Sequence, residues 1–127
     1  MDLILDTNAL SAVVDEQPGI TEALGRAATV AIPVIVLGEY RFGIAQSRRR
    51  AHCEGWLNAS LVAYDVLEVN ERTAKSYAEI RVELKTAGKP IPSNDLWIAA
   101  LCRQHRMTLL SRDRHFDVVD GLRRIVW

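Results

Sequence analysis

The stretch LILDTN at residues 3–8 decides the expected fold, because three apolar residues pass directly into three polar ones. A short, continuous apolar run is typical of a strand that is buried on both faces of a sheet. Asp6, Thr7 and Asn8 are residue types that favour the N-terminus of a helix. The stretch therefore predicts a buried strand followed at once by a helix.

The same alternation continues along the chain. Further strands are expected at residues 29–32, just after 62–64, at 108–110 and at 124–126. Helices are expected from Thr7 to Val14 and over 21–28, 34–45, 48–61, 70–85 and 94–105. Asn70 and Ser93 are expected to cap the last two. Strands linked by helix-length crossovers predict an α/β fold in which a parallel sheet is covered on both faces. A length of 127 residues predicts one domain, residues 1–127.

Composition agrees with a soluble globular protein, with 49% hydrophobic and 25% charged residues. The longest apolar runs are too short to cross a bilayer, and the first residues lack a signal-peptide pattern. We therefore expect a cytoplasmic protein without a membrane partner. Formal net charge is zero, but basic residues cluster locally. They are either a solvated surface or contacts for RNA phosphates, and the candidates are Arg48, Arg49, Arg112 and Arg114.

Two acids follow expected strands. Asp6 ends the first strand, and Asp113 comes shortly after the strand at 108–110. In a parallel sheet, ligands bind beyond the C-terminal ends of the strands, so both carboxylates are expected at one edge. Alternatively, Asp6 caps the following helix, and Asp113 or Asp117 is a turn residue.

Two more acids lie in apolar or rigid surroundings. Glu39 interrupts an apolar helical segment, where a charge needs either a function or a cation such as Arg41 or Arg72. Asp95 falls in the first turn of a helix after a loop with two prolines, and the helix dipole alone would favour it there.

Together, Asp6, Glu39, Asp95 and Asp113 are expected to converge and to remain ionised around a cation. Carboxylate oxygens suit Mg²⁺ or Mn²⁺. Zinc fits poorly, since no histidine or cysteine has the spacing of a zinc ligand set. The three histidines are therefore interpreted as structural or surface residues.

With these residues in order, the chain resembles a PIN domain, specifically the VapC-type toxin ribonucleases of bacterial toxin–antitoxin pairs. The resemblance covers essentially the whole chain. It is carried by four stretches: LILDTN (3–8), VIVLGEYRFGI (34–44), KPIPSNDLWIAA (89–100) and LLSRDRHFDVV (109–119).

The resemblance implies a Rossmann-like, three-layer α/β/α fold with a short, mostly parallel sheet and a metal-dependent endoribonuclease site. It matches Asp6, Glu39 and Asp95 to three family acids and Asp113 to a fourth. Asp6, Asp95 and Asp113 are then metal ligands, and Glu39 ligates or orients the attacking water. Polar positions beside the site are Thr7, Asn8, Ser111 and Asp117. The implied partners are RNA, a cognate antitoxin that inhibits the enzyme, and a second copy in a homodimer.

Three other functions compete with this one. A phosphatase with an aspartyl nucleophile at Asp6 resembles a family that needs a second aspartate where this chain has Asn8. A signalling receiver domain needs two adjacent acids early in the chain, which Asp2 and Asp6 do not supply. A catalytically inert, PIN-like RNA- or protein-binding module stays open, and it has no reason to be stabilised by Mg²⁺ or Mn²⁺.

Overall fold

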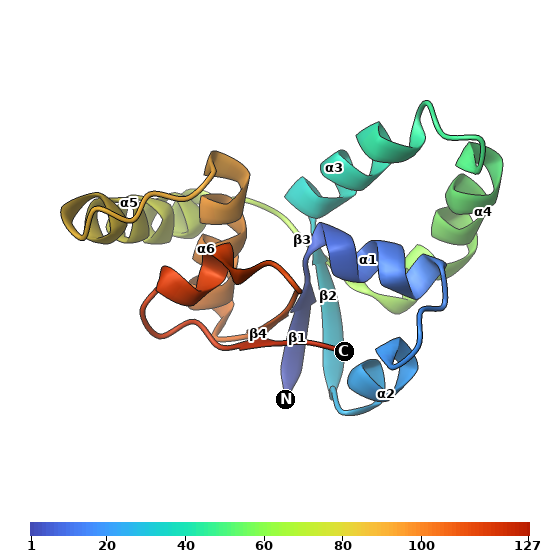
Figure 1. Cartoon of the computed structure of the whole chain (residues 1–127), viewed down its shortest axis with the longest axis horizontal. Helices are drawn as coiled ribbons and strands as arrows, with labels where there is room; N and C mark the ends of the chain where they lie inside the picture. Colours follow the sequence, from blue (N-terminus) through green and yellow to red (C-terminus); the bar gives the residue numbers. More distant parts are fainter.

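A five-stranded, entirely parallel sheet lies at the centre of the molecule (Figure 1). The structure is a computed structural model that describes residues 1–127. The strands are β1 (Asp2–Leu5), β2 (Thr29–Pro33), β3 (Asp65–Leu67), β4 (Thr108–Leu110) and β5 (Arg124–Ile125), in the spatial order β3-β2-β1-β4-β5. Leu5 pairs with Leu110, so the C-terminal ends of β1 and β4 lie side by side.

Six α-helices flank the sheet: α1 (Thr7–Val14), α2 (Ile20–Gly25), α3 (Val34–Ile44), α4 (Arg50–Ser60), α5 (Glu71–Thr86) and α6 (Ser93–His105). Two 3₁₀ segments complete the fold, η1 (Leu61–Ala63) and η2 (Arg114–Val118). Figure 1 shows α5 and α6 together on one side of the sheet and α1 to α4 on the other. The predicted parallel sheet with helices on both faces is confirmed.

The central strand β1 lies in the hydrophobic core. Leu3, Ile4 and Leu5 are fully buried, as the uninterrupted apolar run predicted. Burial of each such side chain contributes about 1.5–3 kcal/mol. Residues 98–101 of α6 are also fully buried, and their two alanines let this helix pack closely. The end of β1 that precedes Asp6 therefore lies within the fully buried core.

Helix ends differ from the predictions in a few places. Asn70 caps α5 as expected, in a reciprocal capping box with Thr73. The prediction that Ser93 caps α6 was wrong: Ser93 is the first helical residue, and Pro92 precedes it without a side-chain cap. Pro92 occupies the N-cap position, and its side chain has no oxygen with which to cap the helix. No helix combines the length and apolar character that spanning a membrane requires.

Candidate metal centre

Asp6 lies at the junction of β1 and α1 with only 5% of its surface exposed. Its Oδ1 accepts the backbone N–H of Thr7 at 2.8 Å, so Asp6 does cap α1. Its Oδ2 accepts the amide of Asn8 at 3.1 Å and the hydroxyl of Ser111 at 2.6 Å. Capping and a site function are therefore compatible, because the cap itself orients the carboxylate toward the end of β4.

Ser111 joins the end of β4 to the start of α1. Its fully buried hydroxyl donates to Asp6 and accepts the backbone N–H of Asp113 at 3.0 Å. Asn8 donates to the same hydroxyl at 3.2 Å and accepts the backbone N–H of Arg112 at 3.1 Å. The loop that carries Asp113 is thereby fixed against the residues that carry Asp6.

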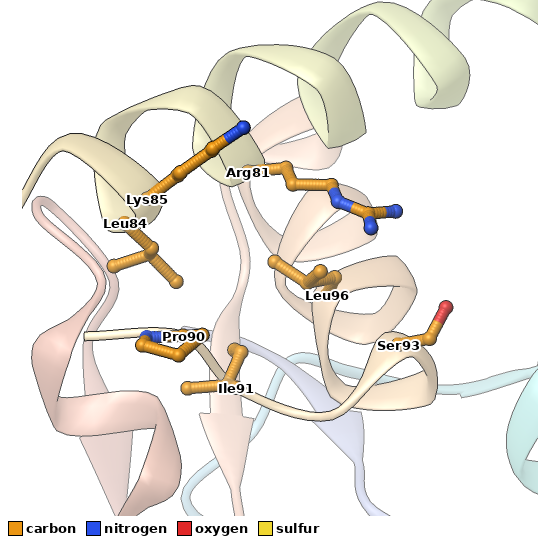
Figure 2. A pocket seen from close by; sticks show the side chains of 7 residues that line it. All are labelled: Arg81, Leu84, Lys85, Pro90, Ile91, Ser93 and Leu96. Carbon is orange, nitrogen blue, oxygen red and sulfur yellow. The ribbon is translucent and has the colours of Figure 1, made fainter. Parts of the chain in front are cut away.

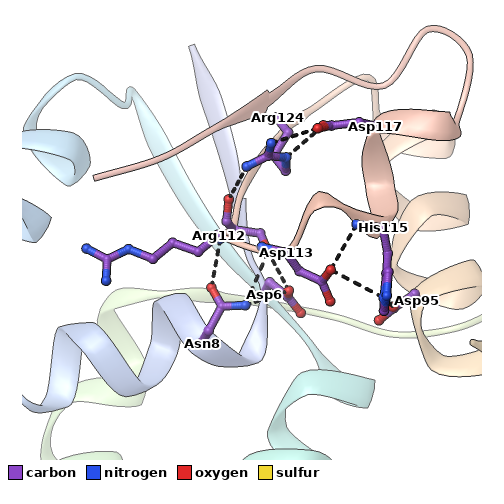
Figure 3. Close-up of polar contacts among 9 residues, drawn as sticks. Asp6, Asn8, Asp95, Arg112, Asp113, His115, Asp117 and Arg124 are labelled. Carbon is purple, nitrogen blue, oxygen red and sulfur yellow. Dashed lines mark hydrogen bonds and ion pairs between the residues drawn. The ribbon is translucent and has the colours of Figure 1, made fainter.

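Asp95 and Asp113 approach each other from α6 and from the start of η2 (Figure 3). Their side chains are 15% and 32% exposed. Nδ1 of His115 lies 3.3 Å from Asp95 Oδ2 and 3.3 Å from Asp113 Oδ1. Burial raises the pKa of Asp95, the hydrogen bond from His115 opposes this, and the charges of Asp113 and Asp6 raise it further. The acids therefore form one electrostatic cluster.

Glu39 reaches the cluster through Thr7. It is half-buried on α3, and its Oε1 accepts the hydroxyl of Thr7 at 3.2 Å. Neither Arg41 nor Arg72 forms a salt bridge with it, which removes the structural alternative considered for this charge. The backbone N–H of Thr7 donates to Asp6, so Thr7 links Glu39 to Asp6.

Asp117 forms an ion pair with Arg124 and none with the residues of the acid cluster. Arg124 donates to both of its carboxylate oxygens at 2.8 Å and, through a third nitrogen, to the carbonyl of Ser111 at 3.0 Å. That guanidinium lowers the pKa of Asp117. Asp117 thus supports the Ser111 loop through Arg124, a residue that sequence analysis did not single out (Figure 3).

Two of the basic candidates, Arg112 and Arg49, already have partners in the structure, and two, Arg48 and Arg114, do not. Arg112 lies over the ring of Trp127, 4.3 Å from its centroid, and donates to the Trp127 carbonyl at 3.1 Å. Arg49 pairs with Asp15. Arg48 and Arg114 are exposed and form no ion pair. Arg48 and Arg114 could therefore bind a phosphate without breaking an existing ion pair.

A cavity of about 350 Å³ lies between α5 and the loop leading to α6, and none of the four acids lines it (Figure 2). Glu39 instead borders an open hollow of about 480 Å³, together with Val34, Phe42 and Asn94.

Comparison with known proteins agrees with this architecture. The PIN domain family model matches residues 3–122. Ribonuclease VapC5 of Mycobacterium tuberculosis is 32% identical over 95 residues, covering 72% of this chain and 70% of that protein. The solved structure of VapBC-5 from the same organism, a member of the VapBC family of toxin–antitoxin systems, has a TM-score of 0.76 at 28% identity over 98% and 96% of the chains.

A second solved structure, VapBC2 from Rickettsia felis bound to a DNA fragment from their promoter, is similar over the whole chain. Its TM-score is 0.88 at 26% identity, and the match covers 100% of this chain and 99% of that one. The family model spans all four acids, from the strand that precedes Asp6 to the loop that carries Asp113. The chain therefore belongs to the PIN domain family and, within it, to the VapC-type toxin ribonucleases of toxin–antitoxin systems.

Proposed function

We propose that this chain is a divalent-metal-dependent endoribonuclease, the toxin of a toxin–antitoxin pair, which hydrolyses RNA phosphodiester bonds with metal-activated water. One observation carries the proposal: Asp6, Asp95 and Asp113 converge at the C-terminal ends of β1 and β4, with Glu39 linked to them through Thr7. Ligands of parallel α/β folds bind at this edge.

The donor set fits a hard divalent cation. Asp6, Asp95 and Asp113 would hold Mg²⁺ or Mn²⁺, because carboxylate oxygens are the ligands these ions prefer. No lysine or arginine forms a salt bridge with any of the three. Burial raises the pKa of Asp95, and the nearby charges of Asp113 and Asp6 raise it further. A bound cation would offset both the burial of this charge and its repulsion by the other acids.

When bound, a divalent ion polarises a phosphoryl oxygen and lowers the pKa of bound water. Glu39, held by Thr7, would accept a hydrogen bond from the attacking water and direct it in line with the scissile bond. Ser111 and Asn8 keep the Asp6 carboxylate in one orientation through the reaction. Arg48 and Arg114 would steer RNA phosphates. Attack by water then leaves a 5′-phosphate and a 3′-hydroxyl.

The partners follow from the family. We propose that a cognate antitoxin covers the acidic edge and inhibits the enzyme, and that the chain forms a homodimer. A basic antitoxin side chain placed among the acids would compensate charges that have no cationic partner from lysine or arginine in this chain.

The test is cleavage of total cellular RNA by the purified full chain, free of antitoxin. Parallel reactions contain Mg²⁺, Mn²⁺ or EDTA, and Asp95→Asn is compared with Asp120→Asn, an exposed acid outside the cluster. We expect cutting with metal that is lost with EDTA and in Asp95→Asn, while Asp120→Asn cuts normally. Mapping of 5′ ends then identifies the cleavage sites. Metal binding without any cutting would instead favour the inert binding module.

A further inference from the structure

The acid cluster contains one nitrogen donor. Nδ1 of His115 lies 3.3 Å from an oxygen of Asp95 and 3.3 Å from an oxygen of Asp113. One donor atom from each of these three residues lies within 4.8 Å of the others. Two acids and an imidazole thus already face a common point (Figure 3).

These separations suit direct coordination. Metal–ligand bonds of about 2.1 Å at right angles place neighbouring ligand atoms about 3.0 Å apart. The two distances of 3.3 Å from His115 are close to this edge length. Small side-chain adjustments, without movement of the backbone, would bring all three atoms onto one ion.

The backbone holds the ring in this place. Asp113 caps η2, and its Oδ1 accepts the backbone N–H of His115 at 2.9 Å. Phe116, the next residue, is fully buried and anchors the segment. The His115 side chain itself is 59% exposed. A ring this exposed contributes little to the core, so packing does not explain why it is aimed at two acids.

We infer that His115 is a metal ligand alongside Asp95 and Asp113, and that its nitrogen favours Mn²⁺ over Mg²⁺ at this site. The inference rests on the proposed function, since it assumes that the acid cluster binds a divalent ion. Mg²⁺ is a hard ion that takes oxygen ligands almost exclusively, whereas imidazole is a common ligand of transition metals. A site made only of carboxylates would have no nitrogen ligand to favour Mn²⁺ over Mg²⁺.

The experiment measures binding and ligand identity without RNA. The full chain is titrated with Mg²⁺ and with Mn²⁺ by calorimetry, and pulsed EPR of the Mn²⁺ complex detects coupling to ¹⁴N. His115→Gln is compared with His105→Gln, which changes an exposed histidine at the end of α6. We expect ¹⁴N coupling in wild type and in His105→Gln but not in His115→Gln. The ratio of Mn²⁺ to Mg²⁺ affinity should fall at least about tenfold in His115→Gln.

Absence of ¹⁴N coupling in the wild-type Mn²⁺ complex would overturn the inference, and this result needs no variant to fold. An unchanged affinity ratio in a folded His115→Gln protein would also overturn it. In either case the proposed nuclease stands if both ions bind and RNA is cut. Failure of the wild-type chain to bind either ion would remove the proposed function and this inference together.

Discussion

Asp95 carries a charge that the folded protein disfavours. Its pKa is raised by burial and by the charges of Asp113 and Asp6, against the opposing hydrogen bond from His115. A raised pKa means that the folded state favours the neutral form. The resulting stability is present below the ordinary carboxyl pKa and is lost as pH rises through the raised one. Asp95→Asn resembles the neutral form at every pH, so without metal it should be at least as stable as wild type at pH 7.

With metal bound, wild type is expected to be more stable than Asp95→Asn. An ion present at 100 times its Kd stabilises the wild-type fold by about 2.7 kcal/mol. An unfolding entropy of about 2.1 cal/mol/K per residue over 127 residues converts this to about 10 °C in Tm. If the loss of one ligand weakens binding about 100-fold, Asp95→Asn gains only about 0.4 kcal/mol at the same ion concentration. Its Tm then rises by about 1.5 °C.

The assay is thermal unfolding followed by calorimetry, with EDTA and with Mn²⁺. Asp120→Asn is the matched control, because it removes an exposed acid that forms no salt bridge and lies outside the cluster. It should keep the full metal-induced shift of about 10 °C. The reasoning is refuted if Asp95→Asn melts below wild type in EDTA and still gains the full shift with Mn²⁺.

Three further outcomes follow from the same contacts. Arg124→Ala removes bonds to Asp117 and to the Ser111 carbonyl, and since Asp117 is half-exposed, we expect a loss of about 1–2 kcal/mol in urea unfolding; no measurable loss would contradict this. Ser111→Ala removes the buried hydroxyl that donates to Asp6, and it should weaken Mn²⁺ binding, measured by calorimetry, about 10–100-fold. An unchanged Kd for Mn²⁺ would show that the hydroxyl is dispensable. Because the pKa of Asp95 is raised, protons compete for it, and Mn²⁺ affinity should fall steadily from pH 7 to pH 5; a constant affinity would exclude this competition.

Much of the fold was predictable because its strongest signals are local. The apolar run before Asp6 is typical of a buried strand, and the alternation of strands with helices predicted a parallel sheet. The same rule placed Asp6 and Asp113 at one edge, and the structure does bring the loops that carry them together through Ser111. The roles of these acids in metal binding and catalysis stay predictions.

The remaining features depend on contacts between distant residues. His115 joins the cluster because a short 3₁₀ segment turns its ring toward Asp95, and such a segment has no periodic pattern to detect. Asp117 was expected beside the site, and in the structure it is bound by Arg124, seven residues later. Orientation of a loop side chain is set by its tertiary partner, which spacing alone does not reveal.

The most direct test of the central claim is the cleavage rate of one defined RNA by the antitoxin-free chain with Mn²⁺, for wild type, Asp6→Asn and Asp120→Asn. Asp6 is the buried acid that three donors orient toward the cluster, whereas Asp120 is exposed and forms no salt bridge. We expect the rate to fall by about 100-fold or more in Asp6→Asn, as when one group of a catalytic site is removed, and to change little in Asp120→Asn. Equal rates for Asp6→Asn and wild type would show that the four-acid cluster does not carry the reaction.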